Sequence, residues 1–295
     1  MFHNNSDVRI EAYRGEDPAR EIYAGRVLRI AGGGRAFVEL LRPRLVELFE
    51  VSNQNDLEFA HEVHDPARLY QLTTRAQAWL REDEGFLRAA RRLLAAFDTG
   101  AQDLRFDGPR LRVVPHDGFR VPAAAPAYYV HRDTWFANPV GQWNWWIPVF
   151  DTPAGRGFRI YPECFDRSVP NNSGEFDLNE WNRAGGFQSG KAGDSAADAA
   201  RQVHPRPNPE WAGENLEGAG RGLAIEGRAG DCVLFSAQHL HGTIPNASGR
   251  TRFSVELRSV RPGDSGTPRE TDNRSRGSTF TTMRPLRDRD SLQAE

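Results

Sequence analysis

The sequence predicts a mainly β, α+β fold in which a helical front precedes a β-rich core. Apolar residues recur at helical spacing before residue 98, whereas short runs of β-branched and aromatic residues follow residue 99. Gly, Pro or Asn separates those runs, and many short strands at close intervals are typical of a barrel or a sandwich. The 295 residues are 38% hydrophobic, which is enough apolar material for a substantial core.

The front of the chain, residues 1–98, is expected to hold one strand and two helical regions. Residues 21–31 (EIYAGRVLRIA) read as a strand that ends at three glycines. Residues 35–50 (RAFVELLRPRLVELFE) have helical spacing, although Pro43 should break or kink the helix. A second helical region covers about 66–97 and opens with Asp65-Pro66, a typical start signal.

The β core is expected over residues 99–261. Residues 103–114 (DLRFDGPRLRVV) look like a hairpin around Asp107-Gly108, and further strand-like runs follow. Residues 166–220 are polar and rich in Gly, Asn and Pro, so we expect a long loop or lid there. The tail, residues 262–295, is charged and rich in Ser and Thr, which is typical of a segment that is flexible or draped over the surface.

Composition excludes several classes of protein. A net charge of −2 argues against a dedicated nucleic-acid surface, and no apolar run approaches the roughly 20 residues of a membrane helix. The N-terminus lacks the apolar core of a secretory signal. The two cysteines are far apart and in no metal-binding spacing. We therefore expect a cytoplasmic protein that binds neither nucleic acid nor membrane; the sequence does not indicate its oligomeric state.

The stretch YYVHRDTWF, residues 128–136, places a histidine and an aspartate two positions apart. Side chains alternate along a strand, so His131 and Asp133 would point the same way, about 6–7 Å apart. An imidazole and a carboxylate would then reach one ion. Alone, such a pair is more often a surface or hydrogen-bonded pair than a metal site.

A second segment, GDCVLFSAQHLHGTIPNASGRTRFSVELR (residues 230–258), strengthens the case. It runs from a Gly-Asp turn through a buried strand into His239 and His241. If the following turn centres near Asn246 and Ala247, Arg252 lies across from His241, with Cβ atoms about 5 Å apart. Ser254 follows on the same face as Arg252.

Two histidines and one carboxylate on a β scaffold match the facial triad that binds non-haem Fe(II) and leaves coordination positions open. An arginine beside the site suits a carboxylate, which its guanidinium can hold by two parallel hydrogen bonds. The combination of His131, Asp133, His241 and Arg252 implies Fe(II), a chelating keto acid and dioxygen.

The order of these motifs resembles the Fe(II)/2-oxoglutarate-dependent oxygenase superfamily: His-x-Asp, Gly-Asp-x-Val-Leu-Phe, His-Gly ten residues after that Asp, and Arg-x-Ser. Residues 230–252 are most similar to its phytanoyl-CoA dioxygenase-like branch. The resemblance covers roughly residues 100–260. It implies a double-stranded β-helix, or jelly roll, with the N-terminal helices packed on one sheet, in a single catalytic domain over residues 1–295.

Carried over residue by residue, the resemblance places His131, Asp133 and His241 at the iron-ligand positions. It places Arg252 where the distal carboxylate of 2-oxoglutarate binds, with Ser254 as its helper. His239 is the rival ligand, but the His-Gly dipeptide, the offset from the Gly-Asp turn and the match to Arg252 favour His241.

The implied reaction is hydroxylation of an unactivated carbon of a small molecule, or its desaturation or cyclisation, with release of succinate and CO2. A natural-product or amino-acid-derived scaffold is the expected substrate. Asp133 disfavours halogenation, since halogenating relatives have a small apolar residue there. The alternative is another cupin-type metalloenzyme, an isomerase or a dioxygenase independent of 2-oxoglutarate; a non-catalytic binding module is a third reading.

Weaker signals surround these positions, and for each of them ordinary packing is the competing explanation. Gln142 and Asn144 share one face of a strand-like run and are candidates to hydrogen-bond the keto acid, as is Tyr129. The candidate substrate contacts are Trp135, Phe136, Arg159, Tyr161 and His239.

Overall fold

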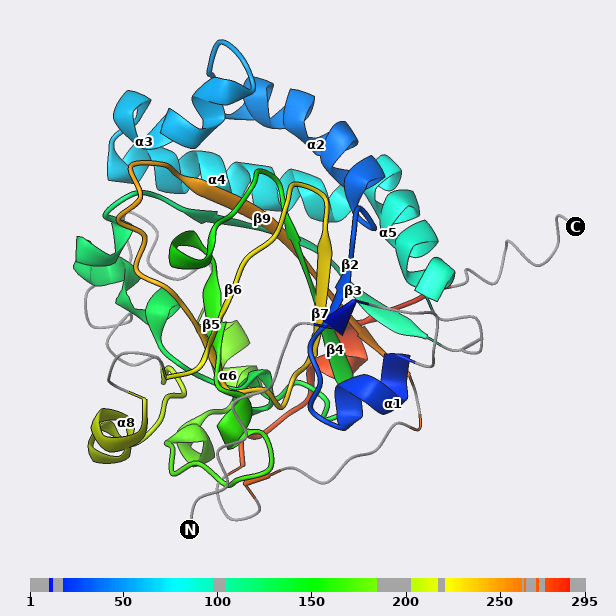
Figure 1. The fold of residues 1–295 in the computed structure, drawn as a ribbon, viewed down its shortest axis with the longest axis vertical. Helices are drawn as coiled ribbons and strands as arrows, with labels where there is room; N and C mark the ends of the chain where they lie inside the picture. The colour runs from blue at the N-terminus through cyan, green and yellow to red at the C-terminus, as the bar shows by residue number, and fades with distance from the viewer. Residues whose placement is uncertain are drawn as a thin grey trace, which may run out of the picture.

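A computed structural model describes residues 11–12, 18–97, 104–184, 203–216, 221–261, 263, 269–270 and 274–286. Two sheets and a set of helices make up these residues, which confirms the α+β prediction (Figure 1). The strands are β1 (Glu11–Ala12), β2 (Leu28–Ile30), β3 (Arg105–Val114), β4 (Gln142–Pro148), β5 (Phe158–Ile160), β6 (Leu223–Ile225), β7 (Cys232–Ser236), β8 (His241–Thr243), β9 (Arg252–Val260) and β10 (Arg284–Pro285). The helices are α1 (Pro18–Tyr23), α2 (Arg35–Leu48), α3 (Ala60–Val63), α4 (Pro66–Glu82), α5 (Glu84–Phe97), α6 (Leu178–Arg183) and α8 (Pro209–Asn215).

The larger sheet has the strand order β1-β2-β7-β4-β9-β3-β10, and the smaller sheet has the order β6-β5-β8. Neighbouring strands are antiparallel except for β1 and β2, which are parallel. In Figure 1 the helices α2, α4 and α5 cover one side of the larger sheet, and β5 and β6 lie on its other side. The predicted packing of the N-terminal helices on one sheet is therefore confirmed.

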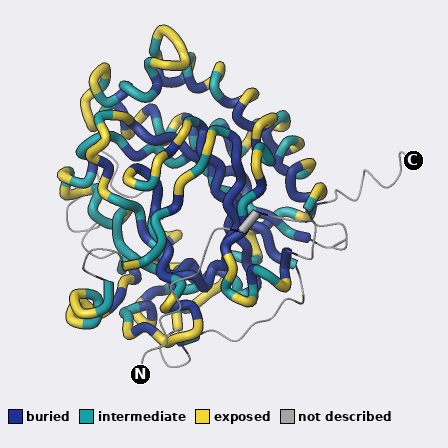
Figure 2. Tube along the Cα trace, viewed as in Figure 1, coloured by how far each residue is buried: buried dark blue, intermediate teal, exposed yellow. Residues whose placement is uncertain are grey.

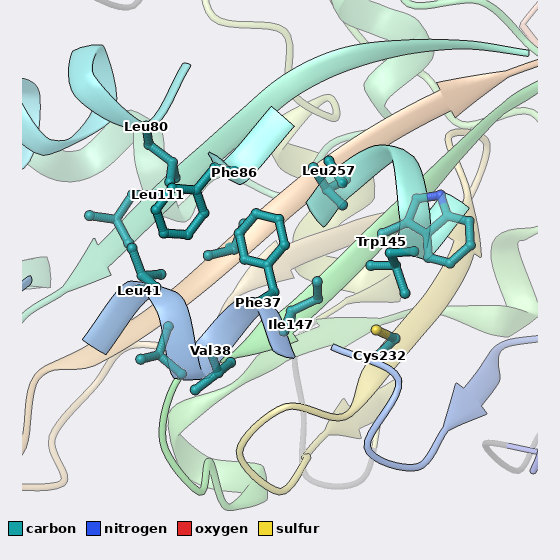
Figure 3. Close-up of a cluster of buried hydrophobic side chains, with 14 of the residues drawn as sticks. Phe37, Val38, Leu41, Leu80, Phe86, Leu111, Trp145, Ile147, Cys232 and Leu257 are labelled. Carbon is teal, nitrogen blue, oxygen red and sulfur yellow. The ribbon is translucent and has the colours of Figure 1, made fainter. Parts of the chain in front are cut away.

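The main hydrophobic core lies between those helices and the larger sheet. Figure 3 shows Phe37 and Leu41 of α2 meeting Phe86 of α5 over Ile147 and Leu257 of the sheet, and the rings of Phe37 and Phe86 are 5.1 Å apart. Figure 2 shows the helices buried on the side that faces the sheet and exposed on the other. Their helical spacing of apolar residues thus produces the layer that covers the sheet.

Strand alternation gives the two faces of the larger sheet different characters. On β9, Phe253, Val255 and Leu257 belong to the main core, so Arg252 and Ser254 point to the opposite face. On β4, Trp143 and Trp145 belong to that core, so Gln142 and Asn144 point away from it. The larger sheet therefore turns an apolar face to the helices and a polar face to the other side.

Several predictions for the front of the chain were wrong in detail. Residues 21–31 are not one strand: Pro18, at the first helical position, begins α1, and only Leu28–Ile30 are extended. Helix α2 continues through Pro43, which is exposed. The region 66–97 is two helices that separate at Asp83. As predicted, Asp65 caps the first of them, accepting a hydrogen bond of 2.7 Å from the Arg68 N–H.

The hairpin predicted around Asp107-Gly108 is also wrong. Residues Arg105–Val114 form one strand that pairs with β9 along both halves, with an irregularity between Asp107 and Arg110. Pro109 lacks an N–H and cannot complete the ladder there, so the chain bulges instead of reversing. An ion pair between Asp107 and Arg110 spans the bulge.

The segment 166–220 and the tail are more structured than predicted. The described part of the first contains helices α6 and α8, and Phe176 and Trp181 are buried in a cluster of their own. In the tail, β10 extends the larger sheet beside β3, and Met283 is buried. Residues 185–202, 217–220 and 287–295 lie outside the described residues. None of the described helices has the length and apolar character needed to cross a membrane.

Candidate metal centre

His131, Asp133 and His241 come together although about 110 residues separate them in the sequence. One ligand atom from each lies within 4.8 Å of the others. His131 and His241 exchange both backbone hydrogen bonds, at 2.8 and 2.9 Å, in an isolated antiparallel bridge. Their ring centroids are 4.5 Å apart, and Nε2 of His131 is 3.5 Å from Oδ1 of Asp133.

The route to this cluster differs from the predicted one. His131 contributes a single bridge and not a strand, and Asp133 begins a 3-10 helix, η4 (Asp133–Phe136). Strand alternation is therefore not what aligns the two side chains. The chain is extended only as far as Arg132 and then turns, which still brings the carboxylate to the imidazole.

The backbone bridge between His131 and His241 explains the glycine at position 242, because the close approach of the two segments requires a small residue there. A Cβ atom on Gly242 would lie 3.0 Å from Cγ2 and 3.2 Å from Cα of Val130. The absence of a side chain lets the segment before His131 approach β8 closely enough to form the backbone bridge.

Each histidine uses Nδ1 for a backbone carbonyl. Nδ1 of His131 donates to the Tyr129 oxygen and Nδ1 of His241 donates to the His239 oxygen, both at 2.9 Å. A carbonyl can only accept, so Nδ1 carries the proton and Nε2 presents its lone pair. Burial, together with His131, lowers the pKa of His241 to about 4, which keeps that ring neutral at pH 7. Both rings are therefore set up as metal ligands through Nε2.

Asp133 is buried and surrounded by donors. Asn144 donates to its Oδ2 at 2.6 Å, Gln142 lies 3.4 Å from the same oxygen, and the guanidinium of Arg258 is 3.5 Å from Oδ1. Burial alone would raise the pKa of this carboxyl, but Arg258 and the two histidines hold it well below its usual range. Asp133 is thus an anion at neutral pH. Two imidazole nitrogens and one carboxylate fit a divalent first-row metal such as iron.

Arg252 and Ser254 lie on the polar face of the larger sheet, as their alternation predicted, but the predicted hairpin register was wrong. Arg252 pairs with Val114 of β3, whereas His241 belongs to the smaller sheet and pairs with Ile160. The segment between β8 and β9 crosses from one sheet to the other, so the two residues are not cross-strand neighbours.

Arg252 is buried and incompletely paired. One of its terminal nitrogens donates to the carbonyls of Arg156, at 3.3 Å, and of Gly157, while its Nε and the hydroxyl of Ser254 are buried without a hydrogen-bond partner among the described residues. Burial lowers the pKa of Arg252 to about 10, which still leaves it charged at neutral pH. A buried cation with a free donor beside a free hydroxyl is suited to an anion.

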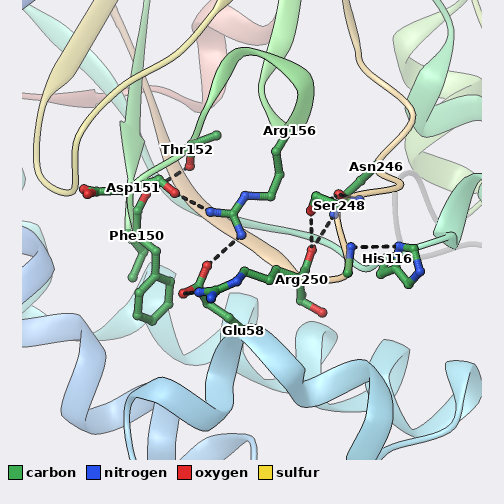
Figure 4. Close-up of polar contacts among 12 residues, drawn as sticks. Glu58, His116, Phe150, Asp151, Thr152, Arg156, Asn246, Ser248 and Arg250 are labelled. Atoms are coloured by element: carbon green, nitrogen blue, oxygen red, sulfur yellow. Dashed lines mark hydrogen bonds and ion pairs between the residues drawn. The ribbon is translucent and has the colours of Figure 1, made fainter.

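A second layer of polar contacts holds Arg252 from behind (Figure 4). Glu58 accepts hydrogen bonds from Arg156 at 2.7 Å and from Arg250 at 2.9 Å, and its backbone oxygen accepts from Thr251. These contacts fix the chain immediately before Arg252, and they also fix Arg156, whose carbonyl accepts a hydrogen bond from Arg252. A cavity of about 640 Å³ lies over this layer and is lined by Glu58, Arg156 and Arg250, away from the three metal-ligand candidates.

His239 does not share a face with His241, because it lies in the turn that follows β7. Its Nε2 donates to the Gly25 carbonyl at 3.1 Å and its Nδ1 accepts from the Ser236 N–H. Its ring packs on Phe165, 4.5 Å away. The structure therefore gives this ring a packing role, and only the His239 carbonyl reaches the site, through His241.

The remaining predicted residues divide into those near the metal-ligand candidates and those that are not. The ring of Phe136 packs edge-on against His131 at 5.2 Å, and Tyr129 contributes its carbonyl to His131 while its own ring contacts His204. Trp135 and Tyr161 are buried in a common hydrophobic cluster. Arg159 instead donates to the carbonyl of Arg221 at the surface.

Two features of the site were missed by sequence reasoning. Arg132, between the two ligand candidates, is fully buried and donates to the carbonyls of Gln238 at 2.9 Å and Cys164 at 2.7 Å, so it anchors the segment that carries them. Arg112 and Glu256 form an ion pair of 3.0 Å on the polar face of β3 and β9. The alternation of charges along residues 252–258 could have indicated that pair, whereas nothing in the sequence indicates the partners of Arg132.

Comparison with known proteins gives remote likenesses only. No protein-family model and no curated protein matches the chain. A solved structure described as the epimerase SnoN with Fe3+, alpha ketoglutarate and nogalamycin RO is 14% identical, with a TM-score of 0.45, over 91% of this chain and 98% of its own. EvdO2 from Micromonospora carbonacea var. aurantiaca is 12% identical, with a TM-score of 0.48, over 86% and 93% of the two chains.

A third match is the non-heme alpha ketoglutarate dependent carbocyclase SnoK from nogalamycin biosynthesis. It is 14% identical, with a TM-score of 0.41, over 92% of this chain and 91% of its own. At these identities and scores the likenesses do not decide the chemistry of this chain, which rests on its own residues.

Proposed function

We propose that this protein is an Fe(II)- and 2-oxoglutarate-dependent oxygenase of small molecules. The observation that carries the proposal is the convergence of His131, Asp133 and His241, with Nδ1 of both rings bonded to backbone carbonyls, which leaves Nε2 for a metal, and with the carboxylate ionised. This donor set matches the facial triad of non-haem iron enzymes. Iron and 2-oxoglutarate, when bound, supply the activation of dioxygen that oxidation of a C–H bond requires.

Arg252 and Ser254 are the proposed anchor for the far carboxylate of 2-oxoglutarate. Nε of Arg252 and the hydroxyl of Ser254, which have no partner among the described residues, provide two buried donors. The guanidinium donates to the carbonyl of Arg156, whose side chain is in turn held by Glu58. A dicarboxylate bound there gains charge-assisted hydrogen bonds at groups that otherwise stay unsatisfied.

The proposed overall reaction divides the two oxygen atoms of O2 between the substrate and succinate. One oxygen atom of O2 enters the substrate C–H bond as a hydroxyl group, and the other enters succinate as CO2 leaves 2-oxoglutarate. The chain's own part is to hold the metal ligands, to anchor the co-substrate and to keep water from the reacting carbon. Desaturation or cyclisation of the same carbon skeleton would use the same residues.

The surroundings of the metal ligands favour a small molecule with both an apolar and a polar part. Phe136 packs against His131, whereas the Arg112–Glu256 ion pair keeps 36% and 25% of its side chains exposed on the polar face of the sheet. An aromatic ring on one side and an ion pair on the other suit a natural-product or amino-acid-derived scaffold. Two sheets with helices outside one of them support a jelly roll, and residues 230–252 support a place near the phytanoyl-CoA dioxygenase-like branch.

Anaerobic titration tests the proposal. Protein freed of metal is loaded with Fe(II), then with 2-oxoglutarate, and the visible charge-transfer band of the chelate is followed. We expect one iron and one 2-oxoglutarate per chain, and no band with the Asp133→Ala variant. A protein that takes up iron without developing a band on adding 2-oxoglutarate would instead favour the alternative, a cupin-type isomerase or dioxygenase that does not use the keto acid.

A further inference from the structure

We infer that Asn144, supported by Gln142, is a positioning residue that makes Asp133 bind the metal through one oxygen only. The inference rests on the proposed function and deepens it, because it concerns how one ligand of the same site is fixed. It differs from the sequence-based prediction, in which these two amides contact the keto acid.

The two oxygens of Asp133 have different surroundings. Oδ2 accepts a 2.6 Å hydrogen bond from Nδ2 of Asn144 and has Nε2 of Gln142 at 3.4 Å. Oδ1 faces Nε2 of His131, which is 3.5 Å away. Since Nδ1 of His131 is bonded to the Tyr129 carbonyl, an ion held by this ring would bind Nε2 and would lie on the Oδ1 side. The amides therefore occupy the oxygen that does not face the ion.

The donors of Gln142 are already committed. Nε2 carries two hydrogens, and its two neighbours are Oδ1 of Asn144 at 2.9 Å and Oδ2 of Asp133 at 3.4 Å. The atom of Gln142 left without a partner is the acceptor Oε1. A carboxylate can only accept, so it finds no donor there. This geometry favours Asp133 over the keto acid as the partner of the amide pair.

The amide pair, Gln142 and Asn144, holds Asp133 rigidly because all three side chains are buried. Gln142 and Asn144 lie two apart on β4 in the centre of the larger sheet, and 0% and 6% of their surfaces are exposed. Asn138 donates to the backbone carbonyl of Asp133 at 2.8 Å, and Arg258 is 3.4 Å from the Asn138 oxygen and 3.5 Å from Oδ1 of Asp133. The carboxylate can neither rotate nor withdraw without breaking these contacts.

A one-oxygen ligand matters for the chemistry proposed. The facial triad leaves three positions open, and the keto acid and dioxygen together require all of them. A carboxylate free to turn would place its second oxygen on the metal and take one of those positions. The amide pair keeps Oδ2 hydrogen-bonded and would therefore leave that coordination position open. Residues that orient a ligand in this way typically affect metal affinity by about 10–100-fold.

The test measures two dissociation constants under anaerobic conditions, that of Fe(II) for the metal-free protein and that of 2-oxoglutarate for the iron-loaded protein. The variants are Asn144→Leu, which has a similar size and no donor, and Gln142→Leu. Gln77→Leu is the matched control, because Gln77 also donates an amide hydrogen bond, of 2.8 Å, but on the helix side of β3. Thermal unfolding identifies any variant that does not fold.

We expect Asn144→Leu to raise the Fe(II) dissociation constant about 10–100-fold and Gln142→Leu to raise it less. Gln77→Leu should leave it unchanged, and all variants should bind 2-oxoglutarate within about threefold of wild type once iron is saturating. If Asn144→Leu does not fold, Asn144→Ser, whose hydroxyl is too short to reach Asp133, should show the same loss.

Two outcomes would overturn the inference without affecting the proposed function. One is unchanged Fe(II) affinity in the Asn144 variants. The other is a weakened 2-oxoglutarate affinity with normal iron binding, which would mean that the amides contact the keto acid and not Asp133. If wild-type protein itself bound no Fe(II), the proposed function would fail and the inference with it.

Discussion

At the scale of single residues, the three histidines discussed above show how backbone carbonyls assign their roles. In His131 and His241, Nδ1 donates a hydrogen bond to a backbone carbonyl and Nε2 is left for a metal. In His239, both ring nitrogens form hydrogen bonds with backbone groups. Two identical side chains, His239 and His241, therefore differ in which ring nitrogen could bind a metal, because the surrounding backbone offers them different hydrogen-bond partners. The sequence alone allowed either His239 or His241 as a ligand, and the hydrogen bonds separate them.

The first prediction concerns His239 and pH. Burial lowers its pKa from 6.5 to about 4, so the unfolded chain takes up a proton before the folded one as the pH falls. Its contribution to stability is complete above pH 6.5 and is lost between pH 6.5 and 4, on the order of 3 kcal/mol. Urea unfolding of metal-free protein at pH 7 and pH 5 measures the loss.

His239→Gln keeps a donor for the Gly25 carbonyl but does not titrate. It should reduce the loss of unfolding free energy between those pH values by on the order of 2 kcal/mol. His241, His61 and His204, whose pKa values burial also lowers, still contribute to the loss that remains. An equal loss in both proteins would show that His239 is not held neutral by the fold.

The second prediction concerns Arg252. Replacing it with Gln removes the charge that is proposed to anchor the far carboxylate, so the affinity for 2-oxoglutarate should fall by at least about tenfold, the equivalent of one charge-assisted hydrogen bond. Fe(II) affinity should stay near that of wild type, because Arg252 does not contact the metal ligands. Arg68→Gln, which removes an arginine on α4 whose side chain is 42% exposed and which is not part of the contacts that hold Arg252, is the matched control. If Arg252→Gln kept the wild-type affinity for 2-oxoglutarate, Arg252 would not be the residue that binds the far carboxylate.

At the scale of elements, the site depends on close approaches between segments and on chain crossings from one sheet to the other. Gly157 is an example, since a Cβ atom on it would lie 1.9 Å from the carbonyl oxygen of Ile225. The same glycine supplies a carbonyl to Arg252. The pairing of β5 with β6 and the proposed anchoring of the co-substrate therefore depend on one tight contact.

The third prediction follows from that contact. Gly157→Ala must push β6 away from the segment before β5, so we expect both a lower melting temperature and a weaker affinity for 2-oxoglutarate. Gly155→Ala is the matched control, because a Cβ atom there meets nothing within 4 Å. Differential scanning fluorimetry and the anaerobic titration measure the two effects. Equal behaviour of the two variants would mean that the contact does not support Arg252.

At the scale of the whole molecule, one apolar cluster joins the helices to the outer face of the larger sheet, while the other face carries the polar site. The fourth prediction tests whether this core is separate from the chemistry. Leu94→Ala, at a fully buried position of α5, should lower the free energy of unfolding by about 2–5 kcal/mol. Leu40→Ala, at a position 53% exposed, should change it little.

Both variants should keep wild-type affinity for Fe(II) at a temperature where they remain folded, because neither position touches the polar face. Weaker iron binding by folded Leu94→Ala would show that packing on the helix side reaches the metal centre.

Much of this organisation was predictable from the sequence. Helical spacing and Asp65-Pro66 located the helical layer, and residue types in two segments identified His131, Asp133 and His241. The register of β9 was not predictable, because a hairpin was assumed where the chain crosses between sheets. The contacts of Arg132 and Asn144 were also hidden, since burial and hydrogen-bond partners at long range depend on how the sheets face each other.

The most direct test is a crystal structure of iron-loaded protein measured at the iron absorption edge. We expect one anomalous peak per chain, within bonding distance of Nε2 of His131, Nε2 of His241 and a single oxygen of Asp133. A peak bound by His239, or no peak near these three side chains in iron-loaded crystals, would contradict the account.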